Sequence, residues 1–311
     1  IMFLFLFFLG LGTTITFASS HWLLAWAGLE LNTLAIIPLM SHHHHPRAIE
    51  ATTKYFLTQA AAAATLLFAA LTNAWLTGQW DIHLLTHPLP ATMAILALAL
   101  KLGLAPLHTW LPEVLQGLNL TTGLILSTWQ KLAPMVLLAQ IPPQNHQLIT
   151  ALAITSTLIG GWAGVNQTQL RKIIAYSSIA HLGWMTLILQ FSPPLTFLAL
   201  LVYISMTSTL FIAFMMTKSL SINKLAASWA KLPMLTLVAL PLLLSLAGLP
   251  PLMGFAPKWL ILQELTKQGL PTLATFTALS ALLSLYFYLR LTYSMTLTVP
   301  PNNMSNTAPW R

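Results

Sequence analysis

Apolar segments of about bilayer length follow one another along most of this 311-residue sequence. A membrane-spanning helix needs about 20 consecutive apolar residues. Only 6% of the residues are charged and 57% are hydrophobic, whereas about a quarter of a soluble domain is charged. The sequence therefore predicts an all-α polytopic membrane protein. About ten segments qualify: approximately 2–19, 22–40, 55–77, 91–114, 120–140, 147–165, 171–191, 195–217, 232–264 and 271–297.

Composition excludes several function classes. The chain has no cysteine, which removes disulfides, thiolate metal sites and iron–sulfur ligation. It has no glycine-rich phosphate loop of the Rossmann or Walker type. The first apolar segment lacks a basic start and leads straight into a second one, unlike a cleavable signal peptide. Because the sequence starts with Ile1 and stops in a polar stretch at Arg311, we expect that it was trimmed at its ends.

The positions of Lys and Arg predict an orientation. The formal charge of +8 would suggest nucleic acid in a soluble protein, but here the basic residues lie between apolar segments. They follow the even-numbered segments, which is the pattern that sets membrane topology. The other side carries essentially Lys267, with Asp81 and Glu264. The N-terminus and the basic loops are predicted to face the electrically negative side. The residues on that side are Arg47, Lys54, Arg171, Lys172, Lys218, Lys224, Lys231, Arg290 and Arg311.

Two segments carry helix breakers at matching places. The fourth contains Gly103, Pro106 and Pro112, and the ninth contains the Gly248–Gly254 stretch with two prolines. Each is the fourth in a group of five, and an odd number of spans makes a second copy enter from the opposite side. Broken helices in inverted halves indicate an ion or substrate path. We predict two five-helix repeats, 1–141 and 142–298, followed by a polar C-terminal loop, 299–311.

Four ionisable residues lie well inside apolar segments: Glu30, Lys101, Lys131 and Lys258. A charge at the bilayer centre costs about 2.5–3.5 kcal/mol even on a gentle scale. Lysine can reach the interface by snorkelling, but Lys131 has roughly 15 Å of apolar helix on either side. A structural Glu–Lys pair is a second interpretation. One acid with three lysines, two of them beside helix breaks, favours a conduction path.

Lysine suits a switchable proton relay. Burial disfavours its charged form and a nearby carboxylate favours it, so the amine can take or release a proton as its partner approaches or leaves. Arginine stays protonated and cannot do this. We hypothesise that Glu30 and Lys101 form a coupled pair, that Lys131 relays the proton, and that Lys258 is the exit-side or reloading station.

Histidines give further candidates. His108 follows Pro106 in the fourth segment and His181 lies within the seventh. Imidazole titrates near neutral pH, which suits proton transfer, although a hydrogen-bonded packing histidine is an equal alternative. The run His42–His45 resembles a metal site or a tag. It has only Glu50 as a nearby acid, so we interpret it as a solvated interfacial loop and predict no metal site.

Several stretches together resemble one family, the chain 2 subunits of mitochondrial NADH–ubiquinone oxidoreductase. The similarity is collinear from about residue 19 to 295, and the compact form resembles the animal version. The matching stretches are Trp26–Asn32, Lys54–Gln59, Lys101–His108, Trp110–Gly117, Thr128–Pro134, Asn166–Lys172, Ala175–Ser178 and Gly248–Trp259.

The resemblance implies a proton-pumping, antiporter-like subunit of respiratory complex I in the mitochondrial inner membrane, with the basic side toward the matrix. It implies two inverted five-helix repeats and proton-path roles for Glu30, Lys101, Lys131 and Lys258, with His181 at a polar mid-membrane position. It also implies that NADH, FMN, iron–sulfur clusters and ubiquinone belong to the host complex and that this chain binds no cofactor. Members end in a further transmembrane helix, which supports a truncated sequence.

We expect the other membrane subunits of complex I and the lipid bilayer as partners, with cardiolipin as a candidate lipid, and no nucleic acid. The chain would then be part of an enzyme, an NADH:ubiquinone reductase, without a redox centre of its own. Two other classes stay open on the sequence. One is a standalone cation/proton antiporter built on the same repeat, and the other is an architectural membrane subunit that pumps nothing.

Overall fold

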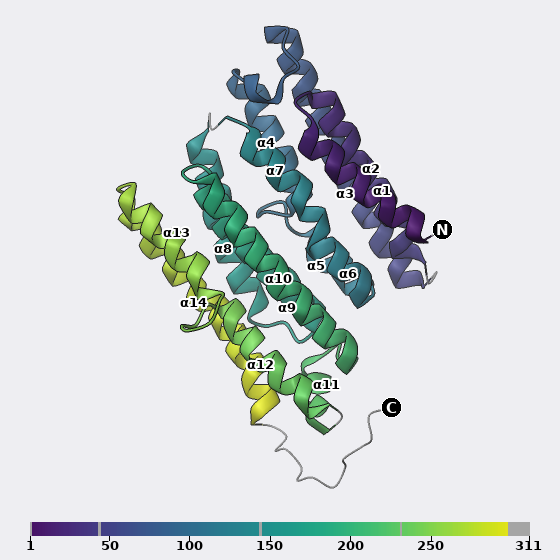
Figure 1. Cartoon of the computed structure of the whole chain (residues 1–311), viewed down its shortest axis with the longest axis vertical. Helices are drawn as coiled ribbons and strands as arrows, with labels where there is room; N and C mark the ends of the chain where they lie inside the picture. The colour runs from purple at the N-terminus through teal and green to yellow at the C-terminus, as the bar shows by residue number, and fades with distance from the viewer. Residues whose placement is uncertain (1, 43–44, 143–144, 231, 298–311) are drawn as a thin grey trace.

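The computed structural model describes residues 2–42, 45–142, 145–230 and 232–297. Long α-helices run side by side along one direction and alternate between up and down (Figure 1). Within these residues the β-structure is limited to two isolated bridges. Six helices are long and apolar enough to cross a bilayer, and further apolar helices are shorter. The prediction of an all-α polytopic membrane protein is confirmed.

The N-terminal half contains three unbroken spans followed by two interrupted ones. The interruptions divide the fourth span into α4 and α5, and the fifth into α6, η2 and α7. The elements are α1 (Met2–Ala18), α2 (Trp22–Ser41), α3 (Pro46–Thr77), η1 (Ile82–Leu84), α4 (Pro88–Leu102), α5 (Trp110–Gly117), α6 (Leu120–Ser127), η2 (Trp129–Lys131) and α7 (Leu132–Gln140).

The C-terminal half has the same order, with short elements after its third span and a break in its fourth. The elements are α8 (His146–Gly164), α9 (Leu170–Leu189), α10 (Pro193–Thr217), α11 (Ile222–Ala226), η3 (Ala227–Ala230), α12 (Pro233–Ala247), α13 (Phe255–Lys267) and α14 (Pro271–Thr296). The predicted C-terminal loop, 299–311, lies outside the described residues, as do His43 and His44.

Both predicted breaks are present and begin in the same way. α4 ends at Gly103 with φ +79°, and α12 ends at Gly248 with φ +86°. Glycine adopts this left-handed conformation without the steric penalty that a Cβ brings. In each case the glycine and the next residue donate backbone hydrogen bonds to the last turn of the helix, which satisfies carbonyls that would lack a partner. The helix therefore stops inside the bundle, and Lys101 and Lys258 lie beside the stops.

A third interruption was not predicted. The fifth span contains the 3₁₀ turn η2, which ends at Lys131. Pro134 follows three residues later, and proline can neither donate a backbone hydrogen bond nor avoid the carbonyl four residues before it. That carbonyl belongs to Gln130, so the α-helical pattern is disturbed where Lys131 projects.

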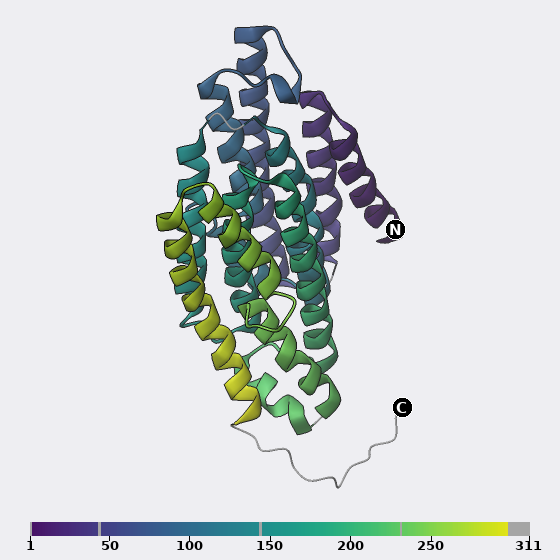
Figure 2. The same ribbon diagram turned by 60° about the vertical axis from the view of Figure 1, so that its left-hand side comes forward.

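α9 forms the centre of the bundle. It contacts α8, α10, α5 and α13, and most of its length is buried. Outward faces of the surrounding helices are apolar and open, as at Leu201 of α10, which is 68% exposed. The amphipathic pattern of a soluble bundle is reversed here, as expected where the solvent is lipid. Figure 2 shows α12, α13 and α14, coloured light green to yellow, lying along one side of the bundle.

Two isolated β-bridges occupy corresponding places in the halves. His21 pairs with Asp81, which joins the turn after the first span to the turn after the third. Gln169 pairs with Ser221 and joins the equivalent turns of the second half. The turn between α1 and α2 and the segment after α3 lie toward the upper end of the bundle, and the turns that follow α8 and α10 lie toward the lower end (Figure 1). The corresponding turns therefore lie at opposite ends, as five spans per half require.

The packing of α8 against α9 depends on Gly160. A Cβ at this position would lie 2.6 Å from the backbone nitrogen of Ala180 and 2.9 Å from the carbonyl oxygen of Tyr176. We expect Gly160→Ala to force the helices apart and to lower stability by about 1–3 kcal/mol, as overpacking does. A lower melting temperature of the assembled protein would show this. Gly10→Ala is the matched control, since nothing lies within 4 Å of its Cβ position, and an equal effect of both changes would contradict the close-packing argument.

Candidate functional site

Lys101 lies in the last turn of α4, directly before the break at Gly103. Its side chain is buried, with 6% exposure, and Nζ has no hydrogen-bond partner among the described residues. An amine in this position needs water or a moving partner, because a buried donor without an acceptor is strongly disfavoured. Trp110 of α5 donates from Nε1 to the Leu100 carbonyl at 3.0 Å, which joins the two halves of the broken helix beside the lysine.

Lys131 lies at the end of η2 and is 3% exposed. Its Nζ donates to the hydroxyl of Tyr203 at 2.9 Å and lies 4.7 Å from the centre of the same ring. Tyr203 belongs to α10 in the other half of the chain. The amine therefore has a neutral hydroxyl and an aromatic face as partners, where a structural ion pair would have a carboxylate.

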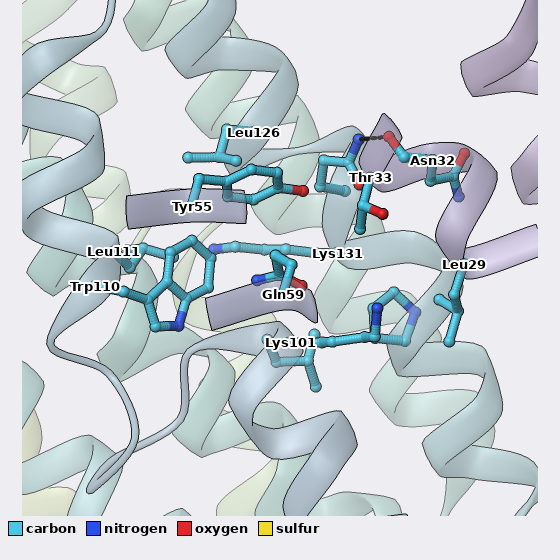
Figure 3. Close-up of a pocket in the computed structure, with 13 residues that line it drawn as sticks. Leu29, Asn32, Thr33, Tyr55, Gln59, Lys101, Trp110, Leu111, Leu126 and Lys131 are labelled. Atoms are coloured by element: carbon cyan, nitrogen blue, oxygen red, sulfur yellow. Dashed lines mark hydrogen bonds between the residues drawn. The ribbon is translucent and has the colours of Figure 1, made fainter. Parts of the chain in front are cut away.

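A cavity of about 20 Å³ connects the two lysines. Lys101, Lys131, Asn32 and Gln59 line it together with apolar and aromatic side chains (Figure 3). Oδ1 of Asn32 and Nε2 of Gln59 are buried without a hydrogen-bond partner, like the amine of Lys101. A volume of about 10–15 Å³ accommodates one water when polar groups surround it. This cavity is therefore large and polar enough for one water molecule between Lys101 and Lys131.

Glu30 lies close to the cavity between Lys101 and Lys131 but forms no ion pair with either lysine. It lies in α2, one residue beyond Leu29 and two before Asn32, both of which line the cavity. Its Oε2 is buried without a partner, and its charge acts on Lys101 through space. The structure contains no Glu30–Lys101 contact within 4.0 Å; the described ion pairs are Lys54 with Glu50 and Glu113, both at 2.8 Å, and Lys267 with Glu264 at 3.9 Å.

A second cavity of about 30 Å³ adjoins Lys258. His181 of α9, Tyr203 of α10 and Ser245 of α12 also line it. Lys258 lies in the first turn of α13, and its Nζ donates to the carbonyls of Ala247 at 2.9 Å and Leu246 at 3.4 Å. The break at Gly248 leaves these carbonyls at a helix C-terminus, where a positive charge is favoured.

The candidate residues thus fall into two groups. Lys101 and Lys131 share the first cavity, with Glu30 beside it, and His181 and Lys258 share the second. His108 lies in the segment between α4 and α5, its Nδ1 buried without a partner. It lines neither cavity.

Sequence reasoning did not identify Tyr203 or Gln59 as site residues. Gln59 entered only as the end of the stretch Lys54–Gln59, and Tyr203 lies in an apolar span whose nearby polar residues are Ser205 and Thr207–Thr209. A phenol or amide in the middle of such a span is the signal that could have indicated them. Of the described residues, no group of three His, Asp or Glu side chains could hold a metal ion. Two members of the predicted loop His42–His45 lie outside those residues.

Comparison with known proteins identifies the family of this chain. Residues 19–284 match the transmembrane family of NADH:quinone oxidoreductases and Mrp antiporters, and residues 285–311 match the C-terminus of NADH dehydrogenase subunit 2. NADH-ubiquinone oxidoreductase chain 2 of Tetraodon nigroviridis is 71% identical over 98% of this chain and 88% of its own length. The same chain of Gadus morhua is 68% identical over 97% and 87%. The chain belongs to the NADH–ubiquinone oxidoreductase chain 2 family.

Solved structures agree on the fold. A chain of respiratory complex I from Thermus thermophilus is 29% identical and covers 96% of this chain and 71% of its own, with a TM-score of 0.87. A chain of the Mrp complex from Dietzia is 17% identical, with a TM-score of 0.81 over 96% of this chain and 60% of its own, and that likeness concerns the fold alone. The chain is a multi-pass membrane subunit of complex I in the mitochondrial inner membrane, and its partners are the other membrane subunits.

Membership in the chain 2 family decides between two of the open classes. The close relatives are subunits of an NADH–ubiquinone oxidoreductase, so the complex subunit is favoured over the standalone antiporter. The enzyme oxidises NADH and reduces ubiquinone as an assembly, and this chain is its antiporter-like membrane part.

The surroundings of Lys131 predict an unusual effect of its replacement on the stability of the assembled complex. No described carboxylate lies within 4.0 Å of its amine, so Lys131→Met breaks no ion pair. It removes a charge that costs about 2.5–3.5 kcal/mol at mid-membrane. We expect the assembled complex to melt at the same temperature or higher, measured by heating and native electrophoresis. Lys267→Met, at an exposed position, is the control; a clear fall specific to Lys131→Met would indicate a structural tie.

Proposed function

We propose that this chain moves protons across the inner membrane through Glu30, Lys101, Lys131 and Lys258, with His181 as an intermediate carrier. The observation that supports this most is the pair of buried lysines around one water-sized polar cavity, without a carboxylate in contact. A structural role would satisfy these amines with acids. Proton exchange requires amines that water and a nearby, unpaired glutamate can reach.

The relay works through the distance between charges. Glu30 near Lys101 favours the protonated amine, and moving them apart favours release toward Lys131 through the first cavity. The proton then passes to the second cavity, where Lys258 is the exit-side or reloading station. Moving one charge against 100 mV costs about 2.3 kcal/mol, which corresponds to a change in proton affinity of about one to two pK units. His108 has no assigned step, because it lines neither cavity.

The redox chemistry belongs to other subunits in this proposal. NADH, FMN, the iron–sulfur clusters and ubiquinone react elsewhere in the complex, and the chain receives their free energy as a conformational change. The absence of cysteine agrees with this division for the iron–sulfur clusters, which need thiolate ligands.

The proposal also includes an orientation. The N-terminus and the basic loops face the matrix, since positive residues concentrate on the negative side of a membrane. Arg171 donates to the Leu118 carbonyl and Arg290 to the Val165 carbonyl at 2.6 Å, so both arginines bind turns at the end that carries Lys218. Lys267 lies at the opposite end, in the last turn of α13.

The boundaries 1–141 and 142–298 are proposed as those of two inverted repeats. Support comes from the matching breaks at Gly103 and Gly248 and from the two bridges between corresponding turns. The halves would meet where Lys131 of the first contacts Tyr203 of the second.

Neutral substitutions in the first group test the relay. We expect Lys101→Met or Glu30→Gln to lower NADH-driven proton uptake by liposomes containing the complex by at least about tenfold, in the range of lost acid–base groups. Ubiquinone reduction should slow with it, because the two processes are coupled. Lys267→Met is the control for charge removal. Intact pumping and quinone reduction in both variants would exclude these roles.

Lys131→Ala separates the relay from an architectural role. If the subunit only supports its neighbours, complexes that assemble with this change should pump at the unaltered rate. The relay predicts assembled complexes with strongly reduced proton uptake, measured with a pH-sensitive dye inside liposomes and normalised to the assembled complex on native gels.

The orientation is testable because the chain has no cysteine of its own. We expect Gln268→Cys to react with a membrane-impermeant maleimide in mitochondria stripped of their outer membrane. Lys224→Cys should react only after the inner membrane is permeabilised. Peptide mass spectrometry would identify the modified site, and the reverse pattern would contradict the proposed orientation.

A further inference from the structure

Tyr203 lies between the two groups of relay residues. It is in the middle of α10 and 4% exposed. Its hydroxyl accepts from Nζ of Lys131 at 2.9 Å and donates to the Ser127 carbonyl at 3.3 Å. Its ring centre lies 5.5 Å from that of His181. One side chain therefore contacts the last lysine of the first group and the histidine of the second.

The two cavities have no lining residue in common. Lys131 lines the first and Tyr203 lines the second. Among the hydrogen bonds of the described residues, the one between Lys131 and Tyr203 joins a residue of one lining to a residue of the other. A proton that leaves Lys131 for Lys258 meets this phenol first.

The chemistry of the hydroxyl suits a passing role. A phenol has one donor hydrogen and two acceptor lone pairs, so it can accept from the amine and donate elsewhere at once. Its bond to the Ser127 carbonyl, at 3.3 Å, is longer than the usual 2.5–3.0 Å of such bonds, so the hydrogen can turn toward another acceptor at small cost. The hydroxyls of Ser178 and Thr207 lie near and add to the polar surroundings.

We infer that Tyr203 passes protons between the two cavities. The inference rests on the proposed relay and adds the step it lacks. An N–H bond of protonated Lys131 breaks as a new O–H bond forms at Tyr203. The original O–H bond breaks at the same time, and its proton bonds to a ring nitrogen of neutral His181, directly or through water in the second cavity. Lys131 becomes neutral, His181 becomes protonated, and Tyr203 ends unchanged.

His181 then transfers the proton toward Lys258, which lines the same cavity. Return of Tyr203 to its starting state needs only rotation of the hydroxyl toward the Ser127 carbonyl. A purely structural interpretation is that Tyr203 ties α10 to η2. The two interpretations differ in whether the hydroxyl affects the transfer rate or only the stability.

Tyr203→Phe removes the hydroxyl and keeps the ring against the amine. In assembled complex reconstituted into liposomes, we expect NADH-driven proton uptake to fall at least about tenfold, as for a lost proton-transfer group. We also expect the solvent deuterium isotope effect on turnover to rise at least about twofold, because proton transfer becomes the slow step. A structural tie would leave the isotope effect unchanged.

Thr196→Val is the matched control. Thr196 lies on the same helix two turns earlier and is fully buried, and among the described residues its hydroxyl bonds only to the Ser192 carbonyl, at 3.2 Å. This change removes a buried hydroxyl from α10 away from both cavities, so rate and isotope effect should stay at the unaltered values. Equal losses in Tyr203→Phe and Thr196→Val would overturn the inference.

Tyr203→His gives a second test that keeps a ring with hydrogen-bonding atoms. We expect proton uptake to recover at least about threefold over Tyr203→Phe, as a group able to transfer protons should allow. If the Phe variant fails to assemble, the His variant is compared with Thr196→Val, and a raised isotope effect is expected. An isotope effect equal to that of the control would overturn the inference.

Lys131→Ala and Lys258→Met distinguish this inference from the relay itself. If both lose proton uptake while Tyr203→Phe retains it, the relay stands and protons reach the second cavity by another way. If both lysine variants pump normally, the relay is wrong and the step at Tyr203 falls with it.

Discussion

The free-energy cost of an amine inside hydrocarbon determines much of this structure. Lys101 and Lys131 are almost fully buried, and neither contacts a carboxylate among the described residues. The chain offsets the cost locally, with a polar cavity beside Lys101 and a phenol beside Lys131. In the proposed relay, amines without a fixed carboxylate partner are the groups that exchange protons, because a nearby carboxylate favours the charged form.

The helix interruptions follow from the same requirement. Backbone groups left unpaired inside a membrane are tolerated only where protein or water satisfies them. At Gly248 the amine of Lys258 donates hydrogen bonds to carbonyls at the end of α12. At Gly103 the Trp110 indole donates a hydrogen bond to a carbonyl at the end of α4. At Gly248 the free carbonyls stabilise the lysine and the lysine satisfies the carbonyls, whereas at Gly103 the indole has that role and the amine of Lys101 faces the cavity.

Predictions from the sequence agree best with the structure for features that depend on residues close together in the chain. The spans, the two glycine breaks and the positions of Lys101 and Lys258 beside them follow from hydropathy and from the conformational freedom of glycine, so they could be predicted. The 3₁₀ turn before Lys131 was missed, although Pro134 indicates it in retrospect. Tyr203 could not be assigned, because its importance depends on a contact with a residue 72 positions away.

The sequence by itself determined that the chain spans a membrane, that two of its helices break at glycines, and which ionisable residues lie at mid-span. These properties depend on neighbouring residues and on transfer free energies, which act along the chain. Only the tertiary structure decided which buried groups meet. Packing of α10 against α6, the helix before η2, brings Tyr203 to Lys131, and the helices α2 to α7 with η2 enclose the first cavity. Such distances depend on how whole helices cross, and no local pattern encodes them.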